Sequence, residues 1–265
     1  MFDLTDRVAI VTGGAGLLGA EFCHTLAEAG AHVVVADIKE EQTLRVAKTL
    51  RVPGLGLKTD VTSRESVKQL LDTTLKSYGR LDILVNSAAL DPKFDPNHAG
   101  EQREFDFENY PLDLWNQALA ANLTGMFLCC QAAVQPMLAQ QQGVIINICS
   151  IYGVVGPDQR LYQRDGQPPQ YKPVYYSVTK AGVLGLTNYL ATYYAGKNIR
   201  VNALTPGGVY NGHDETFVKA YAARTVLGRM ANKDEMNGAL LFLASDASSY
   251  MTGANLIVDG GWTTW

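Results

Sequence analysis

The chain has 265 residues, a formal net charge of −4 and an isoelectric point near 5.6. This length suits one large α/β domain over residues 1–265, and because no basic cluster is present to neutralise phosphates, we expect no nucleic-acid partner. A strand begins within the first ten residues and no apolar run looks long enough to span a bilayer, so we expect no signal peptide, no membrane partner and a cytoplasmic location. The four cysteines and four histidines show no metal-ligand or disulfide spacing, so we expect no metal.

The first elements predict a strand, a glycine-rich turn and a helix. Residues 7–11 are apolar and rich in β-branched side chains, four of residues 12–19 are glycine, and a helical pattern follows as far as Ala29. Glycines allow the backbone to approach a ligand closely, and a helix amino terminus presents N–H groups to a pyrophosphate. Without the flanking elements the turn would be a structural feature only. In this context it predicts dinucleotide binding by Gly13, Gly16, Leu17, Leu18 and Gly19.

A second apolar run, residues 32–36, ends at Asp37, about twenty residues beyond the turn, where a carboxylate can accept hydrogen bonds from an adenosine ribose. The same carboxylate would repel a ribose phosphate. No arginine follows it, although Lys39 is close, so NAD is preferred over NADP as the cofactor. The alternative is that Asp37 only caps the next helix.

Polar residues end the next two predicted strands, 54–58 and 81–85, which flank a helix over 63–78. Ligands of an open parallel sheet bind at the carboxyl ends of its strands. Asp60, Val61, Asn86 and Ala88 are therefore candidate contacts for the adenine and its ribose. Asp and Asn also favour turns, which is the alternative for both.

Three further strands complete a predicted seven-stranded parallel sheet. A long helix over 115–139 contains Asn122 and a following glycine, both poor helix formers, so something other than propensity places them there. Strands over 143–149, 199–203 and 255–258 end respectively at Ser150, at a Thr-Pro-Gly-Gly segment and at an Asp-Gly-Gly segment. The expected fold is a doubly wound α/β sheet.

Tyr176 and Lys180 are four residues apart, a spacing that places two side chains on one face of a helix. A nearby ammonium group favours the phenolate and lowers the pKa of the tyrosine, which makes the pair a proton-transfer device. Tyr175 cannot take this role, because four residues on it meets Thr179, which carries no charge. A chance pair on a solvated helix face is the alternative when the spacing is considered alone.

These features match one family when taken together. The matching positions are the glycine turn, Asp60 with Val61, residues 86–89, Asn122, Ser150, Tyr176 with Lys180, Pro206 with Gly207, and residues 251–261. They resemble a short-chain dehydrogenase/reductase over nearly the whole chain. The resemblance implies a Rossmann-like sheet, a nicotinamide cofactor and a catalytic tetrad of Asn122, Ser150, Tyr176 and Lys180.

The resemblance also implies a role for each residue. Tyr176 exchanges a proton with the substrate oxygen, and Ser150 hydrogen-bonds that oxygen. Lys180 lowers the tyrosine pKa and binds the nicotinamide ribose, while a helix distortion at Asn122 holds a water on a proton path. Backbone groups of the loop formed by Pro206, Gly207 and Val209 orient the carboxamide.

One position departs from the classical members of this family, which have a glycine where this chain has Leu17. The spacing of glycines 13, 16 and 19 is similar to that of extended members acting on nucleotide sugars. An epimerase or dehydratase that retains its NAD is therefore one alternative to a net oxidoreductase. A regulatory or scaffold protein that binds NAD without chemistry is another.

Two insertions, near 91–110 and 152–173, are expected to emerge beside the reaction centre. The second mixes aromatic and ionic residues suited to a polyhydroxylated ligand, and it resembles members of flagellin and surface-polysaccharide sugar pathways. Subunit contacts are the alternative. The segment after Pro206 is polar, which favours a sugar-like alcohol or ketone over a long acyl chain. Candidate substrate contacts are Ser150, Tyr152, Tyr210 and His213.

The last four residues contain Trp262 and Trp265. We expect these aromatic side chains to be exposed and either to bury against a neighbouring subunit of a homo-oligomer, a tetramer or a dimer, or to cover that subunit's pocket.

Overall fold

The structure is a computed structural model, which describes residues 1–91, 106–164, 166 and 169–265. The predicted insertion near 91–110 therefore lies mostly outside the described residues. Residues 165, 167 and 168 of the second insertion lie outside them too.

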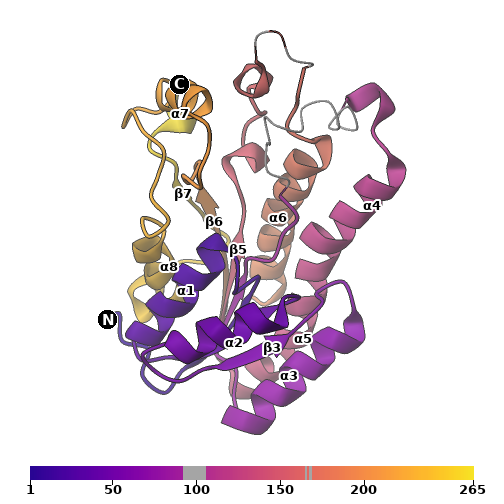
Figure 1. The fold of residues 1–265 in the computed structure, drawn as a ribbon. Coiled ribbons are helices and arrows are strands. Elements are labelled where there is room, and N and C mark those ends of the chain that lie inside the picture. The colour runs from indigo at the N-terminus through magenta and orange to yellow at the C-terminus, as the bar shows by residue number, and fades with distance from the viewer. Residues whose placement is uncertain (92–105, 165, 167–168) are drawn as a thin grey trace.

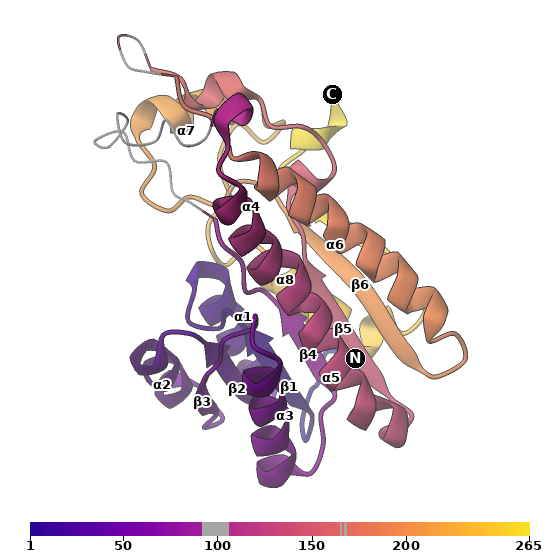
Figure 2. The same cartoon turned by 90° about the vertical axis from the view of Figure 1, so that its right-hand side faces the viewer.

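Within the described residues, seven parallel strands form one sheet in the order β3-β2-β1-β4-β5-β6-β7. This confirms the predicted doubly wound sheet. Figure 1 shows the whole fold, and Figure 2 labels the strands from β3 to β6. The strands are β1 (Val8–Thr12), β2 (His32–Asp37), β3 (Leu55–Lys58), β4 (Ile83–Asn86), β5 (Gly143–Ile148), β6 (Ile199–Pro206) and β7 (Asn255–Val258).

Helices cover both faces of the sheet (Figure 2). One face packs against α1 (Leu17–Glu28), α2 (Glu40–Thr49) and α8 (Asn237–Ala244). The other packs against α3 (Arg64–Tyr78), α5 (Gly125–Gln140) and α6 (Val174–Tyr193). The short helices α4 (Leu112–Leu119) and α7 (Glu215–Ala222) lie toward the end where the strands terminate (Figure 1).

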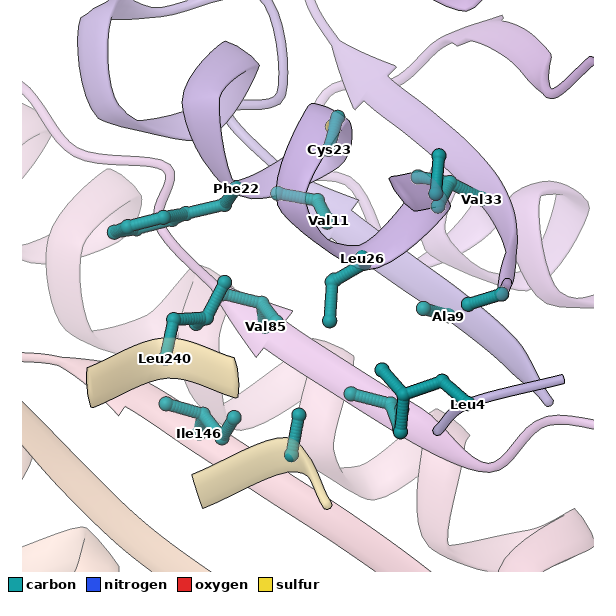
Figure 3. Packing of buried hydrophobic residues seen from close by; sticks show 14 of the residues in the cluster. Leu4, Ala9, Val11, Phe22, Cys23, Leu26, Val33, Val85, Ile146 and Leu240 are labelled. Carbon is teal, nitrogen blue, oxygen red and sulfur yellow. The ribbon is translucent and has the colours of Figure 1, made fainter. Parts of the chain in front are cut away.

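Apolar side chains fill the interfaces between the sheet and these helices. Strands that are buried on both faces carry continuous apolar runs, and all five residues of β1 are buried. In the first layer, Phe22 and Leu26 of α1 face the sheet beside Leu240 of α8 (Figure 3). This packing explains why the strands were recognisable from composition alone.

The predicted long helix is interrupted at the expected place. It consists of α4, a π-helical turn over Ala120–Thr124, and α5. A π-helical turn inserts one extra residue per turn and often marks a functional position. The distortion expected at Asn122 is therefore present, and the boundaries shift to Leu112 and Gln140.

We expected no apolar run long enough to span a bilayer, and by length and composition this expectation is wrong. The helical segment Leu112–Gln140 is long and apolar enough by those measures. It packs against α3, α6 and β5, however, and a core helix of a soluble protein passes the same test. This segment is therefore weak evidence for a membrane.

The packing of α1 predicts a large loss of stability for Leu26→Ala. The Leu26 side chain is fully buried, so its removal leaves a cavity and should lower the free energy of unfolding by about 2–5 kcal/mol. Leu44→Ala on the exposed face of α2 is the matched control and should change it by less than about 0.5 kcal/mol. Urea unfolding followed by circular dichroism measures both. Equal losses for the two variants would contradict this account of the core.

Candidate active site

The strand order reverses between β1 and β4, and the loops that follow these two strands touch at that point. The Thr12 hydroxyl oxygen accepts hydrogen bonds from the N–H groups of Ser87 (3.2 Å) and Ala88 (3.3 Å). A β-carbon added at Gly13 would lie 2.7 Å from the α-carbon of Ala88. In doubly wound sheets, such a reversal opens the crevice in which a ligand binds.

The glycine turn before α1 fits a pyrophosphate. Gly13 has a φ of +64°, and a β-carbon at Gly19 would lie 2.0 Å from the carbonyl oxygen of Gly13, so only glycine permits this backbone. Gly16, the N-cap of α1, makes no side-chain cap hydrogen bond. The first N–H groups of the helix, at Leu17 and Leu18, are therefore not capped by a side chain and can serve an anion.

The departure at Leu17 has a simple structural explanation. Its side chain is 38% exposed, and the preceding Gly16 has an ordinary extended backbone with φ −77°. A leucine at this position therefore does not alter the close packing of Gly13 against Gly19. The leucine at position 17 therefore changes the exposed surface of the turn, and the contact between Gly13 and Gly19 is kept.

Asp37 joins β2 to the glycine turn. Its carboxylate accepts hydrogen bonds from the N–H groups of Ala15 and Lys39, both at 3.2 Å. Lys39, not Asp37, is the N-cap residue of α2. The alternative that Asp37 only caps this helix is therefore wrong, and the carboxylate lies beside the turn that would bind the cofactor.

The side chains at two other strand ends serve the fold. Asp60 accepts hydrogen bonds from the N–H (2.9 Å) and hydroxyl (2.7 Å) of Thr62, which is the turn role left open above. Asn86 is 2% exposed and donates to Asn147 (2.9 Å) and to the sulfur of Cys130 (3.2 Å). Its amide thus faces β5 and α5 within the sheet layer, so the backbone at Ala88 is the better candidate for contact with a cofactor.

Val61, the remaining candidate of this region, packs against the start of α5. A β-carbon added at Gly125 would lie 2.7 Å from the Val61 side chain. This close contact explains why a glycine follows the π-helical turn.

Ser150, Tyr176 and Lys180 converge at the carboxyl end of β5. Lys180 is buried, and its ammonium group donates to the carbonyl oxygen of Ile148 at 2.9 Å. The same ammonium lies 5.8 Å from the centre of the Tyr176 ring. The Ser150 hydroxyl accepts from the N–H of Tyr152 at 3.2 Å and interacts with the side chain of Tyr176. The helical spacing of Tyr176 and Lys180 and the position of Ser150 after β5 therefore bring three of the four tetrad side chains together.

Asn122 completes the group from the π-helical turn. Its side-chain oxygen accepts from the N–H of Leu90 at 2.6 Å, and its amide donates to the carbonyl of Leu90 (3.0 Å) and to Thr179 (3.3 Å). Thr179 immediately precedes Lys180 on α6. Asn122 therefore fixes the loop after β4 against the helix that carries Tyr176 and Lys180.

The electrostatics differ from the sequence-based expectation for the phenol. Burial raises the pKa of Tyr176 well above its ordinary value, the charge of Asp91 raises it further, and the interaction with Ser150 lowers it. Burial also lowers the pKa of Lys180. The expected lowering of the tyrosine pKa by Lys180 is not among these causes, and the Lys180 ammonium is hydrogen-bonded to the carbonyl oxygen of Ile148.

Lys172 is a residue of this site that the sequence analysis missed. Its ammonium group lies 4.0 Å from the centre of the Tyr176 ring and forms an ion pair with Asp91. Lys172 precedes Tyr176 by four residues, the same spacing that selected Lys180. The four-residue spacing could have pointed to Lys172. Because α6 begins only at Val174, however, Lys172 lies before the helix and the spacing does not place it on the same helix face as Tyr176.

The second insertion forms an aromatic lobe with α7 and the end of the chain. We define this lobe as Ile151, Tyr152, Leu161, Tyr162, Phe217, Tyr221, Met230 and Trp262, and Tyr176 packs against it. Tyr152 is buried in the lobe and accepts a hydrogen bond from the hydroxyl of Tyr162 at 3.1 Å. Burial raises the pKa of Tyr152 to about 12. Its hydroxyl therefore helps to build the lobe instead of standing open to a substrate.

Tyr210 and His213 lie beside the lobe, next to Phe217. His213 stacks on Phe217 with ring centres 4.9 Å apart, and its Nδ1 accepts from the N–H of Asn211 at 3.2 Å. Tyr210 is half exposed, 6.2 Å from the His213 ring. The next residue, Asp214, forms an ion pair with Arg164 at 2.7 Å, which joins the insertion to the start of α7.

The expectation that the carboxyl tail exposes two aromatic side chains is wrong for Trp262. This residue is 6% exposed and stacks on Tyr221 with ring centres 4.2 Å apart, so its own subunit buries it. Trp265 is 79% exposed, and its indole N–H donates to the carbonyl of Arg224 at 3.0 Å.

The loop after β6 uses two of its N–H groups internally. Gly207 donates to Val258 at 2.9 Å, and Gly208 donates to the hydroxyl of Tyr221. These bonds fix Pro206 and Val209 beside the lobe. In the described part of the chain, no three His, Cys, Asp or Glu side chains gather as metal ligands would.

Known proteins match this chain over almost its full length. A family model described as enoyl-(acyl carrier protein) reductase matches residues 14–263. The cis-4-hydroxycyclohexanecarboxylate dehydrogenase of Sinomonas cyclohexanicum is 38% identical, covering 97% of each chain. The NAD-dependent glycerol dehydrogenase of Listeria innocua is 33% identical, covering 99% of this chain and 96% of that protein.

A solved structure agrees with these sequence matches. The short chain dehydrogenase of Leptospira borgpetersenii, crystallised with NAD+, superimposes with a TM-score of 0.82 at 31% identity, covering 98% of this chain and 94% of that one. Sequence, sheet order and the convergent site lead to one assignment: the chain belongs to the short-chain dehydrogenase/reductase family, whose members are oxidoreductases with a nicotinamide cofactor.

Proposed function

We propose that this protein is an NAD-dependent oxidoreductase that interconverts a secondary alcohol and a ketone on a polar, sugar-like substrate. The observation that carries this proposal is the convergence of Ser150, Tyr176 and Lys180 at the carboxyl end of β5, next to the strand reversal. A phenol, a hydroxyl and a buried ammonium there can bind a substrate oxygen and move its proton. A relative named as an NAD-dependent glycerol dehydrogenase supports a polar alcohol as substrate.

Each residue of the site has a task in this reaction. The nicotinamide cofactor, when bound, supplies the acceptor or donor of the hydride. Tyr176 takes the alcohol proton during oxidation and returns it during reduction, and Ser150 fixes the direction of the reacting oxygen. Lys180 holds a positive charge beside Tyr176, and Asn122 fixes the helix that carries both. The π-helical turn at Asn122 is the proposed place for a water on the proton path.

The cofactor residues divide into backbone and side-chain contributions. The backbone of Gly13, Gly16, Leu17, Leu18 and Gly19 binds the pyrophosphate, as the uncapped start of α1 allows. Asp37 accepts from the adenosine ribose, which favours NAD over NADP. Because the N–H groups of Gly207 and Gly208 are occupied, we assign the contact with the carboxamide to Val209.

Two other functions remain as alternatives. An NAD-retaining epimerase or dehydratase was suggested by the glycine spacing, but the exposed position of Leu17 removes much of that reason. A regulatory protein that binds NAD without chemistry leaves the buried Lys180 and the convergence at Tyr176 unexplained. We also propose a cytoplasmic homo-oligomer, a dimer or a tetramer, which a mass measurement in solution tests.

The first prediction concerns Tyr176→Phe, which removes the proton-transfer group and keeps the ring. Because general acid–base catalysis contributes about 10²–10⁴-fold, kcat should fall by that factor while NADH binding persists. Alcohol-dependent formation of NADH at 340 nm and fluorescence titration with NADH measure the two effects. An unchanged rate in the variant would contradict the role of Tyr176. Product formed by the wild type without net NADH would favour the NAD-retaining alternative.

The second prediction concerns the choice of cofactor. Asp37→Ala removes the carboxylate that would repel a ribose phosphate, so the ratio of kcat/KM for NADP to that for NAD should rise about tenfold or more, equivalent to about 1.4 kcal/mol. Asp60→Ala, which alters a carboxylate held by Thr62, is the control and should leave this ratio unchanged. A wild-type preference for NADP would contradict the assignment of Asp37.

The third prediction concerns pH. Alcohol oxidation needs the ionised tyrosine, so its rate rises as pH approaches the pKa of Tyr176. The charge of Asp91 raises that pKa, so Asp91→Asn should lower it and move the rising limb of kcat/KM to lower pH. Asp72→Asn, which removes a carboxylate from an ion pair on α3, should leave the profile unchanged. A shift to higher pH in Asp91→Asn would contradict this coupling.

A further inference from the structure

Lys172 brings a second ammonium group to the reaction centre, and the second insertion supplies it. Its side chain is 11% exposed, and its nitrogen lies 4.0 Å from the centre of the Tyr176 ring. The phenol hydroxyl extends from the edge of that ring, so the ammonium lies near the place where the reacting oxygen of the substrate would sit. None of the tasks assigned above to Ser150, Tyr176 and Lys180 uses this group.

Two fixed contacts hold Lys172 in place. The backbone N–H of Lys172 donates to the side chain of Gln159 at 2.8 Å, and its carbonyl accepts from the same side chain at 3.4 Å. The ammonium is paired with Asp91, which follows the Leu90 that Asn122 holds. The backbone anchor does not involve the ammonium group, so the group's chemistry can be changed while the loop stays attached.

Gln170, two residues earlier in the same segment, gives an independent observation. Its side chain is 3% exposed, and neither the oxygen nor the nitrogen of its amide has a hydrogen-bond partner among the described residues. Buried amide groups in native proteins are nearly always paired, because an unmade hydrogen bond is costly. The unpaired buried amide of Gln170, two residues from Lys172 in the chain, is therefore available to a polar group of a ligand.

The combined chemistry of these groups selects one class of ligand. Lys172 donates, Asp91 accepts, and the Gln170 amide does both. Lys172 and Asp91 form an ion pair with no net charge, so the pair offers no net attraction to a carboxylate, and the Asp91 carboxylate would repel one. A purely apolar ring would leave the buried Gln170 amide without a hydrogen-bond partner. A hydroxyl group, which both donates and accepts, suits this set.

On the basis of the proposed function, we infer that Lys172, Asp91 and Gln170 form a subsite that binds a hydroxyl group on the carbon next to the reacting carbinol. The substrates are then neutral vicinal diols and larger polyols. Hydroxylated cyclic carboxylates, for which one relative is named, are disfavoured. Specificity thus comes from the second insertion, which carries Lys172 and Gln170, and from the loop after β4, which carries Asp91.

The experiment compares substrates that differ by one group. Butane-2,3-diol and butan-2-ol differ by the adjacent hydroxyl, and cis-4-hydroxycyclohexanecarboxylate and cyclohexanol differ by the carboxylate. NADH formation gives kcat/KM for each. The wild type should prefer the diol to butan-2-ol by about tenfold or more, because a site built to bind a hydroxyl discriminates against an analogue that lacks it. The carboxylate should give no comparable preference over cyclohexanol.

The variants locate the preference. Lys172→Met keeps the length of the stem over Tyr176 and removes the ammonium, so the ratio of diol to butan-2-ol should fall toward one. Gln170→Leu should lower the same ratio, and Lys172→Arg should retain more of it than Lys172→Met. Lys68→Met, which removes an ammonium from the ion pair on α3, is the matched control and should leave every ratio unchanged. NADH titration shows that each variant is folded.

The outcomes separate this inference from the proposed function. If the wild type oxidises both butane derivatives with NAD and Lys172→Met leaves their ratio unchanged, the subsite is wrong and the proposed function stands. A larger preference for the carboxylate over cyclohexanol than for the diol over butan-2-ol also overturns the subsite. If no secondary alcohol or polyol is oxidised or bound, both are overturned.

Discussion

The buried side chain of Asn122 connects the parts of the molecule on which the site depends. Its oxygen and nitrogen both bind the backbone of Leu90, and its nitrogen also reaches Thr179 on α6. The loop after β4 and the helix that carries Tyr176 and Lys180 therefore share one anchor. Asp91 follows Leu90 and pairs with Lys172, so the anchor extends to the group above the Tyr176 ring. The π-helical turn is what places an amide at the crossing of these elements.

A second set of buried hydrogen bonds connects β4, β5 and α6. Asn86 of β4 donates to Asn147 of β5, and Asn147 donates to Thr187 of α6 at 3.0 Å. Buried amides stabilise only the arrangement that satisfies them, which makes these bonds specific as well as stabilising. Two side-chain hydrogen bonds therefore hold α6 in place, one from Asn122 to Thr179 and one from Asn147 to Thr187. The positions of Tyr176 and Lys180 follow from those of the strands.

The sequence predicted the features that depend on neighbours along the chain. Apolar runs marked the strands, the glycines marked the turn, and the spacing of Tyr176 and Lys180 marked one helix face. Features that depend on distant segments were harder to predict. The burial of Trp262 depends on Tyr221, and the role of Asn86 depends on Asn147 in the next strand of the sheet. The local sequence pattern predicts which helix or strand a residue belongs to and which face it occupies. Which distant residue it contacts can be seen only in the tertiary structure.

The aromatic lobe makes the end of the chain part of the catalytic half of the molecule. It draws side chains from the insertion after β5, from α7 and from Trp262, and Tyr176 packs against it. Arg224 extends this contact, since its guanidinium lies 5.2 Å from the Trp262 ring and pairs with Asp158 of the insertion. Trp262, far from Tyr176 in the sequence, thus supports the loop that delivers the tyrosine. A substitution at Trp262 is therefore expected to disturb the position of Tyr176 through this aromatic packing alone.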